Sequence, residues 1–158
     1  MEVKDGQRVL KFDGEEIGFS TSKRRGATRW IEFSLYRTHE THQYILSRIG
    51  YSKLFHLPEC EIAERSRLDE SPRGELLEDD VPCDICEPHR SDFPFVSFER
   101  EKHWARVFKT PEDVIEALMK VDIKSGNRYM TAVARRLLDD AGAVDDPIHE
   151  AQNVEIVR

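Results

Sequence analysis

Cysteine is scarce in this chain, and long hydrophobic runs are missing. The 158 residues include 3 cysteines, and no uninterrupted run of hydrophobic residues exceeds three. A membrane-spanning helix needs about 20 apolar residues, so we expect no membrane span. Three cysteines cannot all pair within one chain, which argues against a disulfide framework and favours a reducing, cytoplasmic location. The charged opening, MEVKDGQRVLKF, also lacks the apolar segment of a secretory signal.

The glycine-rich patterns that hold nucleotides are missing as well. The 8 glycines form no P-loop, no dinucleotide fingerprint and no G-x-S-x-G elbow for a serine nucleophile. We therefore expect no nucleotide cofactor. The formal net charge of −7 argues against general coating of nucleic acid, because phosphate neutralisation requires a basic surface.

Acidic charge is concentrated in the middle of the chain. Residues 1–50 carry 9 basic and 7 acidic side chains, residues 51–92 carry 5 and 12, and residues 93–158 carry 10 and 12. Within the middle part, residues 61–82 hold 8 acids and 3 arginines. This composition predicts a polar connector, part helix or loop, on the surface.

The first half of the chain predicts an antiparallel β-meander. Ile31, Phe33 and Leu35 alternate with side chains of the opposite face, as in a half-buried strand. Asp13-Gly14 is a tight-turn signal between two strands. The segment HETH, residues 39–42, predicts the next turn. The expected strands are residues 8–12, 15–22, 30–37, 43–50 and 51–56, with two further strands at 93–98 and 103–108.

The last fifty residues change to a helical period. Thr110 can cap a helix that has Pro111 in its first turn, and Asp113 can reach back to the cap. Residues 125–127, SGN, end this helix, and a second helix is predicted from about residue 128 to Gly142. The apolar side chains of the two helices are Val114, Ile115, Leu118 and Met119, then Tyr129, Met130, Val133, Leu137 and Leu138. Strands followed by helices predict an α+β fold, with a β-rich part at 1–109 and a helical segment at 110–158 packed on the same unit.

All three cysteines fall in one pattern with metal-ligand spacing. His56, Cys60, Cys83 and Cys86 form H-x3-C-x22-C-x2-C. Two short pairs of nitrogen and sulfur donors on separate segments are what a closed tetrahedral Zn²⁺ site requires. His89, three residues after Cys86, is a possible replacement for His56 as the fourth ligand. The alternative is a set of buried apolar cysteines beside an incidental histidine.

The stretch YSKLFHLPEC…VPCDICEP resembles the Ada-like metal-binding domain and its related small zinc modules over residues 51–90. The resemblance implies one Zn²⁺ held by His56, Cys60, Cys83 and Cys86, in a protein of bacterial or phage type. In the DNA-repair branch the position of His56 is a methyl-accepting cysteine. An imidazole cannot act as the metal-activated thiolate nucleophile that accepts the methyl group, so the resemblance here implies a structural zinc module. A second stretch, residues 8–48, is similar to the β-rich region of small actinobacterial EXLDI proteins, which implies no function.

A catalytic metal is the enzymatic alternative. PCDIC matches half of the cytidine-deaminase signature, but the other half needs H-x-E or C-x-E, and Cys60 is followed at the second place by Ile62. A zinc hydrolase would need three ligands and an open position, with Glu59 or Glu87 as a base. Two acids beside a zinc knuckle are more often solvated surface.

One dense basic segment offers a nucleic-acid interface. Lys23, Arg24, Arg25 and Arg29 stand beside Trp30, as in a phosphate-contacting hairpin tip with an aromatic stacking platform. The alternative is an exposed turn that discourages edge-to-edge strand pairing. The favoured interpretation of the whole sequence is a small, non-enzymatic binding or adaptor protein with one structural Zn²⁺ and a protein partner. A nucleic-acid-associated protein and a zinc hydrolase are the alternatives.

Overall fold

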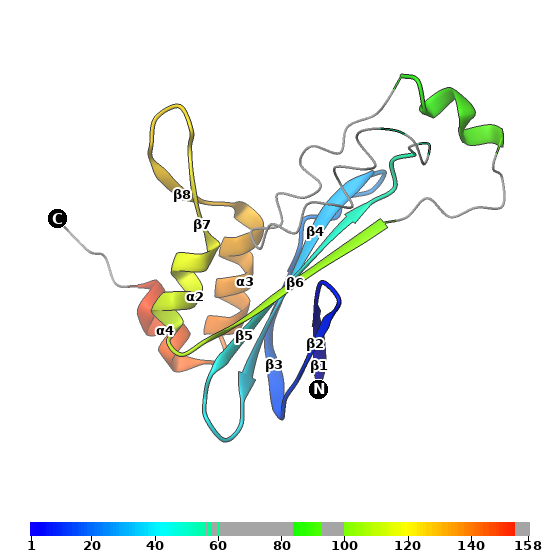
Figure 1. The fold of residues 1–158 in the computed structure, drawn as a ribbon. Coiled ribbons are helices and arrows are strands. Elements are labelled where there is room, and N and C mark those ends of the chain that lie inside the picture. The colour runs from blue at the N-terminus through cyan, green and yellow to red at the C-terminus, as the bar shows by residue number, and fades with distance from the viewer. Residues whose placement is uncertain (56, 58–59, 61–83, 93–99, 154–158) are drawn as a thin grey trace.

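A computed structural model describes residues 1–55, 57, 60, 84–92 and 100–153 of the chain. Its centre is a four-stranded antiparallel sheet in the order β3–β4–β5–β6 (Figure 1). The strands are β3 (Gly14–Thr21), β4 (Arg29–Thr38), β5 (Tyr44–Ser52) and β6 (Arg100–Phe108). The helices cover one face of this sheet, and a hairpin of β1 (Glu2–Asp5) and β2 (Arg8–Lys11) lies on the other.

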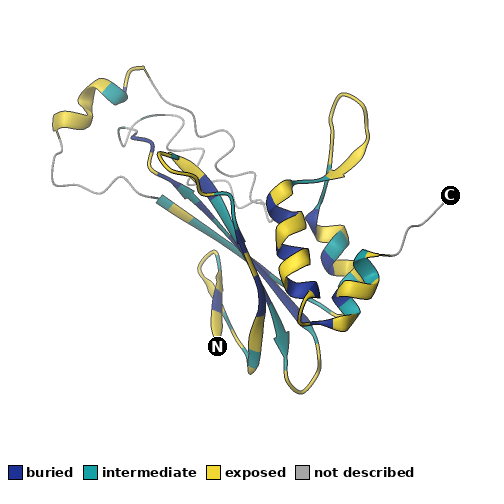
Figure 2. Cartoon of the chain, turned by 180° about the vertical axis from the view of Figure 1, so that it is seen from behind, coloured by how far each residue is buried: buried dark blue, intermediate teal, exposed yellow. Residues whose placement is uncertain are grey.

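The main core lies between the sheet and the helices α2 (Pro111–Leu118), α3 (Ala132–Gly142) and α4 (Asp146–Gln152). Figure 2 shows the buried sides of the helices turned toward the sheet. The predicted alternation in β4 is confirmed, since Phe33 and Leu35 are buried in this core and Ile31 packs against it. The other buried side chains of the core are Ile17, Tyr44, Leu46, Val114, Leu118, Val133, Ala134, Leu137, Leu138, Ala141 and Ile148.

The hairpin face has a smaller core, in which Val3 packs with Ile45 and Ala105. Because Ile45 lies between Tyr44 and Leu46 on β5, this strand is covered on both faces. The predicted turn at Asp13-Gly14 is wrong as a hairpin between residues 8–12 and 15–22. The hairpin turn lies at Gly6, where φ is 60°, so that β2 pairs with β1 and β3 pairs with β4.

Of the remaining strand predictions, one is confirmed, two correspond to a single strand, and one lies outside the described residues. Residues 103–108 are the greater part of β6, and the turn at residues 39–42 separates β4 from β5, as predicted. The two expected strands 43–50 and 51–56 are instead one strand, β5, which ends at Ser52. The expected strand 93–98 and the polar connector 61–82 lie outside the described residues.

The start of the first predicted helix is confirmed together with its cap, but its predicted end at residues 125–127 is wrong, because α2 ends at Leu118 and the chain continues as a strand. The Thr110 hydroxyl accepts the Asp113 N–H at 3.2 Å, and Pro111 occupies the first turn of α2. The predicted start of the second helix is wrong by four residues. Arg128–Met130 is the strand β8, paired with β7 (Met119–Val121), and α3 begins at Ala132 after the cap residue Thr131. Helix α4 follows the buried cap residue Asp145.

Both outer edges of the sheet are engaged by side chains or turns. On β3, the Phe19 N–H donates to Asp140 at 2.8 Å, and the Arg136 guanidinium donates to the Thr21 carbonyl at 3.1 Å. On β6, the His103 carbonyl accepts the Gly6 N–H at 2.8 Å, and Asp5 accepts the Ala105 N–H at 3.4 Å. Edges occupied in this way offer fewer unpaired groups to another strand.

The architecture is therefore α+β, with an antiparallel strand meander followed by helices, as the sequence predicts. Sheet and C-terminal helices contribute to one core. Among the described helices, none combines the length and the apolarity that crossing a bilayer requires.

Candidate metal centre

The first half of the predicted metal motif is anchored to the end of β5. After Ser52, the Lys53 N–H donates to the Thr28 carbonyl at 2.8 Å, and the Leu54 N–H donates to the Ser52 hydroxyl at 3.3 Å. Leu54 and Phe55 are 4% and 3% exposed. Sheet hydrogen bonds and apolar burial thus hold the segment that leads into His56, which itself lies outside the described residues.

The second half of the motif is a turn at residues 84–86 followed by the 3₁₀-helix Glu87–Asp92. The Cys86 side chain is 2% exposed, whereas its neighbour Ile85 is 75% exposed. The carbonyl of Cys86 accepts the His89 N–H at 2.9 Å, which closes a short turn after the cysteine. Cys83 lies outside the described residues.

Three contacts bring the two halves side by side, although about thirty residues separate them in the chain. The Leu57 N–H donates to the Cys86 sulfur at 3.3 Å. The Phe55 N–H donates to the Glu87 carboxylate at 3.4 Å, and the Arg90 guanidinium donates to the Lys53 carbonyl at 2.7 Å. Among the described residues, the two segments of the motif therefore lie in contact.

The buried Cys86 sulfur accepts one backbone N–H, from Leu57. A backbone N–H aimed at the sulfur favours the charged form of a thiol, and such donors commonly support metal-bound ligands. Cys60 is half-buried, and its N–H donates to the Leu57 carbonyl at 2.9 Å, so Leu57 links both described cysteines through its backbone. No disulfide joins Cys60 to Cys86.

The complete ligand set extends beyond the described part of the chain. Among the described residues, no group of three or more histidine, cysteine, aspartate or glutamate side chains is placed to hold a metal ion. Of the four predicted ligands, only Cys60 and Cys86 are among the described residues, so no group of described residues could include His56 or Cys83. The four-ligand Zn²⁺ site therefore stays a prediction, supported by the pairing of the two segments.

The other residues considered at this site are engaged in contacts of the 3₁₀-helix. His89, the replacement ligand, is half exposed and its Nδ1 lies 3.2 Å from the Asp92 carboxylate. Glu87, a candidate base for a hydrolase, accepts the Phe55 N–H and lies 3.5 Å from the Arg90 guanidinium. The other candidate base, Glu59, lies outside the described residues.

The basic segment runs through the connection between β3 and β4 and ends at Arg29, the first residue of β4. Lys23, Arg24, Arg25 and Arg29 are all exposed, as a phosphate contact would need. Trp30, in contrast, is 5% exposed. Its ring stacks on Tyr51 of β5, with ring centroids 5.1 Å apart, and the ammonium groups of Lys23 and Lys53 lie 4.6 and 5.3 Å from it. This burial removes Trp30 from the exposed part of the predicted interface.

A pocket that the sequence did not predict lies on the helix face of the sheet, lined in part by Arg48, Trp104, Lys120 and Lys124. The first two come from β5 and β6, and the others from β7 and the turn after it. No motif links residues so far apart, so their gathering depends on strand pairing. The sequence signal that does exist is a charged Arg48 within the otherwise largely buried strand β5.

Comparison with known proteins adds no family assignment, because no family model, no curated protein and no solved structure matches the chain significantly.

Proposed function

We propose that this chain is a small, non-enzymatic binding protein that presents its surface to a protein partner, with one structural Zn²⁺ at the end of β5. His56, Cys60, Cys83 and Cys86 would be the ligands. The observation that carries the proposal is the contact of the Leu57 N–H with the buried Cys86 sulfur. It joins the two segments on which the four ligands lie.

A metal at this place would stabilise the attachment of the segment after Cys86 to the sheet. Few described apolar residues join the segment after Cys86 to the sheet, and the 3₁₀-helix Glu87–Asp92 has no buried residue. A segment with so little core of its own gains from a metal link, because Zn²⁺ binding contributes folding free energy directly. Four ligands from the protein leave no position for a substrate, which is why we infer a structural role.

The test is metal analysis by native mass spectrometry on the wild type and on Cys83→Ser. We expect one zinc per wild-type chain and none in the variant, with the main sheet retained. His56→Ala should also release the metal, while His89→Ala, the matched control, should keep it. A folded wild-type protein without zinc would contradict the proposal, and metal loss in His89→Ala alone would transfer the fourth ligand to His89.

X-ray absorption at the zinc edge separates the structural site from the hydrolase alternative. Three sulfur ligands at about 2.3 Å and one nitrogen ligand at about 2.0 Å are expected for the structural site. An imidazole ligand also gives scattering from its ring carbons, which a water lacks, so three sulfur ligands without that signal would indicate a bound water and would support the hydrolase.

Association with nucleic acid is a second candidate, favoured by the position of the basic segment beside the metal segment. The Lys53 N–H bonds to Thr28, and the Lys23 and Lys53 ammonium groups both approach the Trp30 ring. Lys53 therefore extends the basic surface of residues 23–29 toward the candidate metal centre. Such a surface would bind through phosphates, with an affinity that falls as salt rises.

Fluorescence anisotropy with a labelled single-stranded oligonucleotide tests this candidate. Reversal of the charges at Lys23, Arg24, Arg25 and Arg29 should abolish salt-dependent binding. The matched control reverses four exposed charges elsewhere, at Lys4, Lys11, Lys109 and Arg135. Equal loss in both variants, or no binding by the wild type at low salt, would reject the interface.

A further inference from the structure

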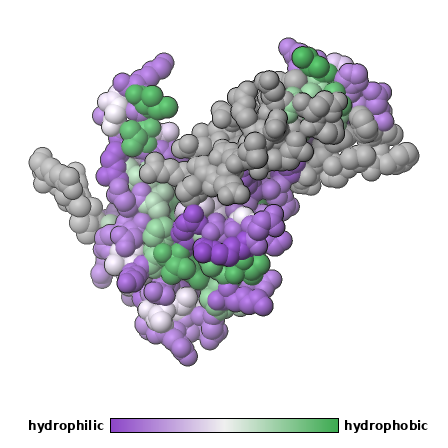
Figure 3. Space-filling view, in the orientation of Figure 1, coloured by the Kyte–Doolittle hydropathy of each residue, from purple (hydrophilic) through white to green (hydrophobic). Residues whose placement is uncertain are grey.

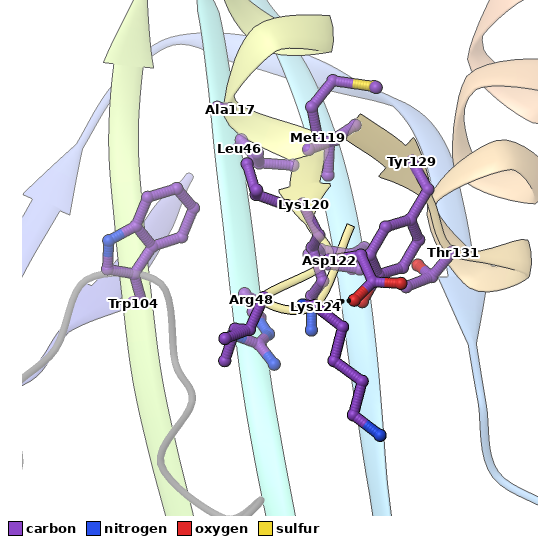
Figure 4. Close-up of a pocket in the computed structure, with 14 residues that line it drawn as sticks. Leu46, Arg48, Trp104, Ala117, Met119, Lys120, Asp122, Lys124, Tyr129 and Thr131 are labelled. Atoms are coloured by element: carbon purple, nitrogen blue, oxygen red, sulfur yellow. Dashed lines mark hydrogen bonds between the residues drawn. The ribbon is translucent and has the colours of Figure 1, made fainter. Parts of the chain in front are cut away.

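A pocket of about 780 Å³ opens between the helix face of the sheet and the β7–β8 hairpin. Its volume is in the range of sites for small organic ligands. Phe33 and Leu46 contribute from the sheet, and Leu118 from the end of α2. Figure 4 shows Trp104 on one side of the pocket and Tyr129 on the other, with Arg48 between them in this view. None of the described lining residues belongs to the candidate metal centre, and the inference is argued from those residues without the Zn²⁺ proposal.

An aromatic–cationic–aromatic row crosses the sheet at this pocket. In the strand register, Arg48 of β5 is the partner of Phe33 on β4 and of Trp104 on β6. Arg48 is 5% exposed, and its guanidinium carbon lies 5.8 Å from the centroid of the Phe33 ring. Guanidinium planes and aromatic rings both offer flat faces on which a planar ligand can stack.

Positive charge dominates the described lining of the pocket. Arg48, Lys120 and Lys124 contribute three cationic groups, and Asp122 is the single acidic side chain among the described lining residues. The Asp122 carboxylate accepts the Lys124 N–H at 2.9 Å within the turn that follows β7. This local excess of positive charge favours an anion over a cation or a neutral molecule in the pocket.

Exposed apolar side chains also line the pocket on the hairpin side. Ile123 is 99% exposed and Val121 is 55% exposed, and both line the pocket. Figure 3 shows green, hydrophobic atoms on the part of the molecule where the β7–β8 hairpin lies. A ligand with a hydrophobic ring would gain from contact with this surface, whereas a small inorganic anion would not.

We propose that this pocket binds a small organic anion with a planar ring, whose charge is a carboxylate or a phosphate. The ring would lie against the row of Phe33, Arg48 and Trp104. The anionic group would interact with Arg48 and the lysines of the β7–β8 hairpin. The combination of ring and charge distinguishes this class from neutral hydrophobic molecules and from phosphate alone.

Two fluorescent probes that share their rings test the proposal on the full-length protein. Anilinonaphthalene sulfonate carries an anionic group, and N-phenylnaphthylamine is its neutral counterpart. We expect saturable binding of about one sulfonate probe per chain, about tenfold tighter than the neutral probe, as one charge-assisted contact would give. Equal affinities for the two probes would overturn the proposal.

Three variants connect the affinity to the pocket. Lys124→Glu, in an exposed turn, should weaken binding of the sulfonate probe about tenfold and leave the neutral probe unchanged. Lys11→Glu makes the same charge change on the hairpin of the opposite face and should leave both affinities unchanged. Arg48→Met removes the cation and should act like Lys124→Glu, provided that its circular dichroism matches the wild type. The same loss in Lys11→Glu as in Lys124→Glu would contradict the assignment to this pocket.

Competition then identifies the anion. Displacement of the bound probe by AMP indicates a phosphate ligand, and displacement by indole acetic acid indicates a carboxylate. Displacement by neither compound, in a protein that binds the sulfonate probe, would overturn the assignment to this ligand class.

Discussion

At the scale of single residues, Asp145 is a buried carboxylate with three partners from different elements. It is 4% exposed, forms an ion pair with Arg37, and accepts the Tyr44 hydroxyl at 2.8 Å. It also caps α4 by accepting the Ile148 N–H at 3.2 Å. A buried carboxylate without these partners would be costly, so the three contacts together fix α4 to the sheet.

Tyr44→Phe tests this cluster through pH. Burial, and then the hydrogen bond to Asp145, raise the pKa of Tyr44 well above the usual value near 10. Above about pH 10 the unfolded chain loses this proton while the folded chain keeps it, so the stability from Tyr44 is full below that pH and declines above it. Burial also raises the pKa of Tyr36. Tyr36 is present in both proteins, so its contribution cancels in the comparison.

We therefore expect Tyr44→Phe to lower the free energy of unfolding by about 1–2 kcal/mol at neutral pH, because Asp145 loses a donor. The difference from the wild type should shrink above about pH 10, by at most about 1.4 kcal/mol per pH unit. Denaturant titrations at a series of pH values give this difference. A difference that stays constant across the series would show that Tyr44 titrates alike in the folded and unfolded chains.

At the scale of elements, α3 packs unusually close to the edge strand β3. A Cβ at Gly18 would lie 2.9 Å from the Ala141 Cβ and 3.1 Å from the Leu137 carbonyl oxygen. This approach places Asp140 on the Phe19 N–H and Arg136 on the Thr21 carbonyl. The missing side chain at Gly18 thus allows the helix to occupy the strand edge.

A double-mutant cycle tests this close approach. Gly18→Ala should lower the free energy of unfolding by about 1–3 kcal/mol, the usual cost of overpacking. Ala141→Gly alone should cost about 1 kcal/mol of helix propensity. The double variant should be more stable than the sum of the two losses predicts, because Ala141→Gly removes the nearest clash. Strictly additive losses would contradict direct contact.

At the scale of the whole molecule, sheet and helices depend on one core. Leu137 of α3 is fully buried, in the same cluster as Leu35 and Leu46 of the sheet. The helical segment 110–158 and the strands should therefore unfold together rather than as separate units.

Leu137→Ala should lower the free energy of unfolding by about 2–5 kcal/mol, because the fully buried side chain leaves a cavity. The helix signal in circular dichroism and the fluorescence of the tryptophans in the sheet should change at the same denaturant concentration. Ile123→Ala, at a side chain that is 99% exposed, is the control and should change stability by less than about 0.5 kcal/mol. Separate transitions by the two probes would show two independent units.

Local signals in the sequence were sufficient for several features. The Thr110 cap with Pro111 correctly gave the start of α2, and alternation correctly gave the buried face of β4. Cysteine spacing identified two segments that the structure places in contact through Leu57 and Cys86. Each of these signals depends on residues a few places apart, where backbone geometry and side-chain chemistry are fixed locally.

The tertiary structure decided the rest. Two Asp-Gly pairs offer the same turn chemistry, and the packing of Val3 on Ile45 and Ala105 accompanies a hairpin at Asp5-Gly6 and none at Asp13-Gly14. A stacking platform for nucleic acid would need an exposed Trp30, yet its ring is buried and stacks on its cross-strand neighbour Tyr51.

Nor could the sequence show that Arg48 and Trp104 meet in one pocket, or that Tyr44 reaches Asp145 across 101 residues. The sequence alone therefore determined the class of fold and the α2 cap, and the four metal ligands that it suggests stay a prediction. Strand pairing, the burial of Trp30 and the charged pocket required the folded chain, because these features depend on which distant surfaces exclude water together.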